Sequence, residues 1–260
     1  MNYFFFLDPA NTALESSVEL FNKPPIRRLN RSDLFDSDIV AFYSNGNKWI
    51  SHTIDRIKIN EYKIIFKKDL PGHFKDQSVY ISLFKNDFTD GDSLIAEESM
   101  QSIPEWRSNI KISSKTCSCS YQGEYPSAMT EKKISVVSCS PMIQIDHNFL
   151  TTFYLVNLSK NAKIEDFDLE ILSPNKKILL KSKMRTNTIN AINLNNIDEA
   201  KNYKMLIFKS EKNGGIPLYF SRNQSNTMMS IEHTHPPSSY LVFGTPYYFQ
   251  AKKKSYWFDK

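Results

Sequence analysis

Two histidines near the end of the chain have the spacing of metal ligands. His233 and His235 are two residues apart, so on a β-strand both imidazoles point to one face while Glu232 points to the other. With a third ligand from elsewhere in the chain, for which His147 is the best candidate, they could hold one divalent transition metal, zinc or iron. The simpler interpretation, which we favour, is that both rings bond to backbone carbonyls where Pro236 ends the strand.

Three cysteines form the second candidate cluster. Cys117 and Cys119 share one strand face, and we expect an antiparallel partner to bring Cys139 opposite Cys117. A histidine would complete a tetrahedral zinc site, but zinc-binding cysteines more often come in Cys-x-x-Cys turns, and free cysteines pack well as small hydrophobic residues. An odd cysteine count in a long chain favours a reducing compartment, so we expect a cytoplasmic protein.

An aromatic loop and the C-terminal tail offer groups for binding. Tyr121 and Tyr125 supply rings for stacking, and Gln122 and Glu124 supply hydrogen bonds, which suits a glycan or a peptide. The alternative is that the tyrosines pack onto a sheet edge. In the tail, Trp257 stands among aromatic residues and lysines, a pattern that serves the core or an interface, including that of a homo-oligomer, before it serves nucleic acid.

The chain lacks the common catalytic signatures. It has no Gly-x-Ser-x-Gly elbow, no Walker loop, no His-Glu-x-x-His and no dinucleotide fingerprint. We therefore predict a non-catalytic protein without a cofactor that recognises a protein partner or a glycan through the aromatic loop and the tail. The alternative is a metal-dependent enzyme with His233 and His235 as ligands and Glu232 or Glu124 as general base.

The elements that must position these residues are mostly strands. Phe167, Leu169 and Ile171 alternate with acidic residues, which predicts a half-buried strand. In the range 149–158, odd-numbered and even-numbered positions are both mostly apolar, as in a central strand covered on two sides. Turn residues predict two hairpins, one at Asn45-Gly46 and one at 213–215.

One segment has a different period. Leu14, Val18 and Phe21 share a helical face, and Thr12 with Glu15 has the spacing of a capping box. This pattern predicts a short helix over residues 12–21.

Composition sets the remaining bounds. The 260 residues are 40% hydrophobic and 23% charged, enough to build a core, and the net charge of +5 is too small and too spread to favour nucleic acid. No run reaches the ~20 apolar residues of a membrane-spanning helix, so we expect no membrane span.

The strand pattern predicts an all-β protein. We expect two antiparallel β-sandwich domains, Ig-like or jelly-roll-like, with a short N-terminal helix. A polar segment around Pro104 places the boundary, so that residues 1–105 form the first domain and residues 106–260 the second.

Overall fold

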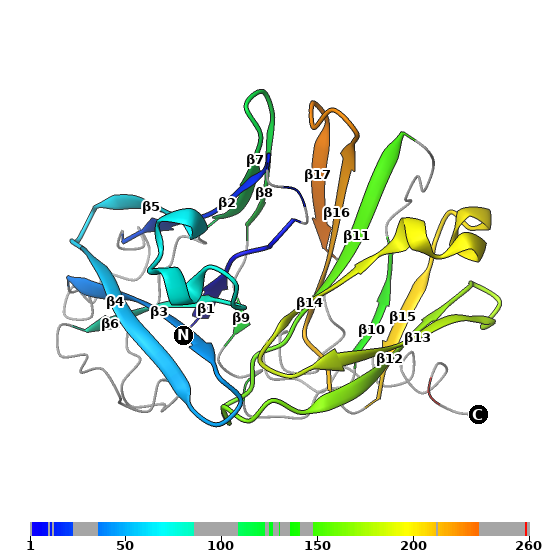
Figure 1. Ribbon diagram of the computed structural model, residues 1–260, viewed down its shortest axis with the longest axis horizontal. Helices are drawn as coiled ribbons and strands as arrows, with labels where there is room; N and C mark the ends of the chain where they lie inside the picture. Colours follow the sequence, from blue (N-terminus) through cyan, green and yellow to red (C-terminus); the bar gives the residue numbers. More distant parts are fainter. Residues whose placement is uncertain are drawn as a thin grey trace, which may run out of the picture. The chain divides into compact units, whose positions relative to one another are not determined.

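The computed structural model describes residues 2–9, 11, 13–22, 36–85, 109–122, 125–126, 130, 136–140, 148–211, 213–233 and 258. These residues form antiparallel β-sheets (Figure 1), and Phe258 is the one described residue in α-helical conformation, so the all-β prediction is confirmed. Four short 3₁₀ helices also lie in the described ranges: η2 (Lys67–Asp69), η3 (Gly72–Phe74), η5 (Leu194–Asn196) and η6 (Asp198–Asn202). No helix in these ranges has the length and apolar character needed to cross a membrane.

The chain divides into two compact units. Unit 1 comprises Met1–Thr130 and Lys160–Ile164, and unit 2 comprises Glu131–Ser159 and Glu165–Lys260. The boundary expected at residues 105–106 lies outside the described residues.

Unit 1 contains two sheets. The β3 sheet has the order β4 (Trp49–Ile57), β3 (Ser37–Ser44), β6 (Tyr80–Lys85), β1 (Asn2–Phe5) and β9 (Tyr125–Pro126). The β2 sheet has the order β5 (Tyr62–Phe66), β2 (Glu15–Phe21), β7 (Asn109–Ser113) and β8 (Ser118–Gln122). Both sheets contribute to one hydrophobic core, to which the β3 sheet supplies Phe4, Ile39 and Ile81 and the β2 sheet supplies Val18 and Leu20.

Unit 2 also contains two sheets. The β12 sheet has the order β10 (Val136–Cys139), β15 (Ile207–Ser210), β12 (Asp166–Leu172) and β13 (Ile178–Arg185). The β11 sheet has the order β14 (Ile189–Asn193), β11 (Phe149–Val156), β16 (Ile216–Asn223) and β17 (Met229–His233). Their shared core includes Phe153 of β11 stacked on Phe208 of β15, with ring centroids 4.0 Å apart.

The prediction of two Ig-like or jelly-roll-like sandwiches is wrong. The chain forms four small antiparallel sheets, three of four strands and one of five, across its described residues. Sheets of this size are the units that β-propellers repeat as blades. Within unit 2, β12 and β13 of the β12 sheet cross the direction of β11 and β16 of the β11 sheet in Figure 1. Period-two alternation reports which face of a strand is buried, but not which strands share a sheet.

The predicted N-terminal helix is also wrong. Residues Glu15–Phe21 form β2, which pairs with β5 on one side and β7 on the other. Val18 and Leu20 enter the core on one face of this strand. The helical spacing of Leu14, Val18 and Phe21 is overridden because pairing on both edges satisfies the backbone and the strand buries Val18 and Leu20 in the core.

The two predicted hairpins have different outcomes. Asn45-Gly46 joins β3 and β4, which pair as expected, and Gly46 adopts a φ of +97°, which favours glycine. The turn at 213–215 joins β15 to β16, which lie in different sheets, so this hairpin prediction is wrong. Gly215 is needed for a close approach, since a Cβ there would lie 2.0 Å from the carbonyl oxygen of Val156.

The central strand of the β11 sheet is as predicted. β11 pairs with β14 and β16, and its second half, from Phe153 to Val156, is buried on both parities.

Candidate functional site

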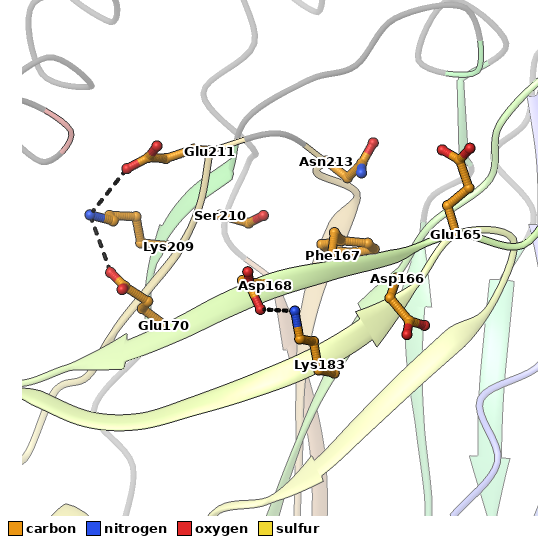
Figure 2. A pocket seen from close by; sticks show the side chains of 10 residues that line it. All are labelled: Glu165, Asp166, Phe167, Asp168, Glu170, Lys183, Lys209, Ser210, Glu211 and Asn213. Atoms are coloured by element: carbon orange, nitrogen blue, oxygen red, sulfur yellow. Dashed lines mark ion pairs between the residues drawn. The ribbon is translucent and has the colours of Figure 1, made fainter.

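A pocket of about 550 Å³ lies in unit 2, beside the first half of β12 (Figure 2). Carboxylates dominate the described part of its lining, in which the basic residues are Lys183 and Lys209. The acidic residues that line it are Glu165, Asp166, Asp168, Glu170 and Glu211.

The alternation of β12 accounts for this concentration. Phe167, Leu169 and Ile171 are buried in the core of unit 2, as the sequence predicts. Successive side chains of a strand point to opposite faces, so Asp166 and Asp168 are exposed on the other face. Burial of the apolar set therefore fixes the acidic set on a single surface.

The neighbouring strand β13 supplies bases opposite these acids. Asp168 and Glu170 lie opposite Lys183 and Lys181 in the antiparallel register. The Lys183 Nζ is 2.6 Å from the Asp168 Oδ1, and the Lys181 Nζ is 2.8 Å from the Glu170 Oε1. Opposite charges that face each other across a strand pair stabilise the pairing modestly.

Glu170 is the most strongly held carboxylate of the pocket. Besides Lys181, it contacts Lys209 of β15, whose Nζ is 3.3 Å from its Oε2 and 3.7 Å from the Glu211 Oε1. The hydrogen bond from Lys181, followed by that from Lys209, lowers the pKa of Glu170 below its usual value. The carboxylate therefore stays ionised at neutral pH and is unsuited to act as a general acid.

Two residues that line the pocket, Asp166 and Ser210, lack polar side-chain contacts in the described ranges. Asp166 makes no ion pair within the described ranges. The Ser210 side chain is 2% exposed, and its hydroxyl has no hydrogen-bond partner among the described residues. Figure 2 shows this hydroxyl directed toward Asn213 and Phe167. An unsatisfied buried hydroxyl costs about 1–3 kcal/mol, a cost that a suitable ligand can offset.

A residue of the C-terminal tail lies next to this network. Phe258 packs against a small apolar cluster that includes Val137, Leu172 and Ile207, and its ring centroid is 5.5 Å from the Lys209 Nζ. A cation over an aromatic ring is held in place by the ring quadrupole. Trp257, the tail residue predicted to bind a ligand, lies outside the described residues.

The predicted metal ligands are only partly described. His233 is exposed at the end of β17, opposite Leu218 of β16, whereas His235 and His147 lie outside the described residues. The Ser230 hydroxyl donates to the Glu232 Oε1 at 2.9 Å, which agrees with Glu232 facing away from His233. The described ranges contain no group of three or more histidine, cysteine or acidic residues placed to hold a metal ion. The histidine site stays a prediction.

The aromatic loop, residues 121–125, is described except for Gly123 and Glu124. Tyr121 of β8 is 9% exposed and Tyr125 of β9 is 1% exposed, while Gln122 is exposed. Both tyrosine rings are therefore packed, and Gln122 is the member of this set that faces solvent. A ligand-binding role for the four residues stays a prediction.

The cysteines do not pair as expected. β8, which contains Cys119, pairs with β7, and β10, which contains Cys139, pairs with β15, so the predicted strand pairing of Cys139 opposite Cys117 is wrong. Burial, with a smaller effect of Cys117, raises the pKa of Cys119 to about 12, and burial raises that of Cys139. Both thiols are protonated at neutral pH, which suits packing better than nucleophilic chemistry.

The acidic pocket was not predicted from the sequence. The alternation of β12 marks its acidic face, and the bases Lys181, Lys183 and Arg185 alternate in the same way along β13. Two such segments of opposite charge would have been a usable signal for a paired, charged surface. Nothing local indicates that β15 leaves this surface after Ser210.

Comparison with protein families, with curated proteins and with solved structures finds no match for this chain. Function must therefore be argued from the site alone.

Proposed function

We propose that this protein is a non-catalytic binding module that recognises a basic segment of a protein partner through the acidic pocket of unit 2. The observation that carries the proposal is the excess of carboxylates among the described lining residues of one cavity, five against two lysines. A charged cleft of one sign attracts ligands of the other sign and speeds their association. The proposal keeps the predicted class of function and moves the contact from the aromatic loop to the pocket.

Binding is better supported than acid–base chemistry. Asp168 and Glu170 are held by lysines, and the lowered pKa of Glu170 keeps that carboxylate charged. Ionised carboxylates on a sheet surface are acceptors for ammonium and guanidinium groups. A cytoplasmic location and self-association remain predictions that accompany this function.

A basic partner is also favoured over a glycan. Tyr121 and Tyr125, the rings predicted to stack on a sugar, are buried. The aromatic residue that lines the pocket, Phe167, is itself part of the core. The pocket thus offers charge in place of an open aromatic platform.

The test uses the whole chain and short capped peptides of alternating sequence. We expect the basic peptide Val-Lys-Val-Lys-Val to bind, its acidic counterpart Val-Glu-Val-Glu-Val not to bind, and added salt to weaken the basic complex. The triple variant Glu165→Gln, Asp166→Asn, Glu211→Gln should bind the basic peptide about tenfold more weakly, at roughly 0.5 kcal/mol for each partly screened charge. Isothermal titration calorimetry measures each affinity.

The matched control removes the same number of charges elsewhere. The triple variant Asp69→Asn, Asp76→Asn, Asp198→Asn alters exposed carboxylates outside the pocket and should bind as the unmodified protein does. Equal losses in both triple variants would attribute binding to general charge and overturn the proposal. Binding of a neutral oligosaccharide such as maltotetraose, with none of the basic peptide, would overturn it in favour of a glycan.

A further inference from the structure

The pocket exists because β12 has unequal partners on its two edges. β13 pairs with β12 along its whole length, from Asp166 to Leu172. β15 pairs with β12 only from Glu170 to Leu172, and the strand ends at Ser210. The edge of β12 from Asp166 to Leu169 therefore has no partner strand on that side within the described part of the chain. At about 3.3 Å per residue, this open edge is roughly 13 Å long.

The register shows which backbone groups face the open edge. The Thr186 amide donates to the Glu165 carbonyl at 2.9 Å, so Glu165 directs its backbone groups toward β13. In an antiparallel sheet the residues of a strand bond alternately to one neighbour and the other. Asp166 consequently directs its N–H and C=O to the opposite side, where β15 would continue and where Glu211 and Asn213 line the pocket.

We propose that the open edge of β12 captures a short extended segment of the partner by main-chain pairing at Asp166, with the pocket carboxylates receiving its basic side chains. This inference rests on the proposed function and adds the binding mode to it. An extended peptide that adds to a sheet edge gains affinity from main-chain hydrogen bonds and specificity from its alternate side chains. The partner segment is thus expected to carry Lys or Arg at every second position.

Two observations beyond the acidic residues support an occupant here. The buried Ser210 hydroxyl, without a partner in the described ranges, lies on the wall of the gap where β15 ends. Asp166 combines an open backbone edge with a carboxylate that is free of ion pairs within those ranges. Natural proteins usually cover or charge such an edge, because unpaired backbone groups recruit other chains.

The experiment separates main-chain pairing from charge attraction. In the peptide Val-Lys-Val-Lys-Val, one backbone nitrogen at a time is methylated, which removes a single donor and leaves every charge. We expect methylation to weaken binding at least fivefold at the one position whose N–H would bond the Asp166 carbonyl, and by less than twofold at the other positions. Hydrogen–deuterium exchange of the Asp166 amide should slow when the unmethylated peptide is bound.

The outcomes distinguish charge recognition by the pocket from main-chain pairing at Asp166. If every methylated peptide binds as well as the parent, while replacing lysine with norleucine abolishes binding, charge recognition stands and the pairing mode is overturned. If the parent peptide fails to bind, the proposed function itself fails. Equal weakening at all positions, with no single sensitive nitrogen, would also contradict pairing at Asp166. Because the changes are in the peptide, folding of the protein does not affect the interpretation.

Discussion

The two halves of β12 have the same alternating pattern but different neighbours. In the half from Glu170 to Leu172, β13 and β15 pair on both edges, and Glu170 is held by lysines from both. In the half from Asp166 to Leu169, β13 is the one pairing strand among the described residues, and the acidic side chains border the pocket. The half with two partner strands has the contacts of a structural element, whereas the other half carries Asp166, which makes no ion pair in the described ranges.

The largest expected difference between the halves is in stability. Phe208 of β15 lies opposite Ile171 and stacks on Phe153, so Phe208→Ala should lower the free energy of unfolding by about 3–5 kcal/mol. Asp166→Ala in the open half should change it by no more than about 0.5 kcal/mol. Urea denaturation monitored by circular dichroism measures both. Comparable losses would show that the open half is also structurally required.

A smaller difference is expected between the carboxylates themselves. The Glu170 side chain is 20% exposed and contacts two lysines, so Glu170→Gln should cost about 1 kcal/mol. Asp168 and Lys183 are both 68% exposed, and Asp168→Asn should have almost no effect on stability. The same denaturation assay compares the two variants, and a larger loss for Asp168→Asn would reverse our assignment of the halves.

The pH dependence of stability sharpens this comparison. The folded pKa of Glu170 lies below its usual value of 4.5, so the unfolded chain binds the proton more readily. The stabilisation is therefore complete above about pH 4.5 and is lost as the pH falls through the folded pKa. The stability gap between the unmodified protein and Glu170→Gln should close in acid. If the difference in unfolding free energy between the two proteins is unchanged at about pH 2.5, below the usual carboxyl range, ionisation of Glu170 is not its cause.

The smallest expected effect concerns the open half alone. Lys183 lines the pocket and is largely exposed, so Lys183→Ala should leave stability within about 0.5 kcal/mol of the original. Removing this positive charge makes the pocket more negative and should strengthen binding of Val-Lys-Val-Lys-Val by roughly twofold. Lys181→Ala, beside the doubly paired half, serves as the comparison and should change affinity less. A weaker complex with Lys183→Ala would indicate that this lysine itself contacts the ligand.

Some elements follow directly from local sequence. The apolar and acidic alternation of β12 is correctly predicted, as is the β3–β4 hairpin, because Asn45 and Gly46 close the turn between adjacent segments. The helix predicted over residues 12–21 fails, since pairing of β2 with β5 and β7 brings in strands from far along the chain. Local spacing alone could not weigh that gain.

The candidate site also depends on contacts between distant residues that local sequence does not indicate. Glu170 and Lys209 are 39 positions apart by their numbers in the chain but adjacent in the sheet, and neither residue carries a local indication of the other. The 213–215 turn was predicted to close a hairpin, yet it carries the chain from β15 into another sheet. That departure is why β15 does not pair with β12 at Asp166.

The sequence by itself determined the all-β character and the face on which each side chain of β12 lies, because alternation is a local property of an extended backbone. The tertiary structure decided how strands group into four sheets, where β15 parts from β12, and which lysines reach Glu170. Those outcomes depend on long-range pairing, in which distant segments compete for the same edge, and the balance is set by the whole core.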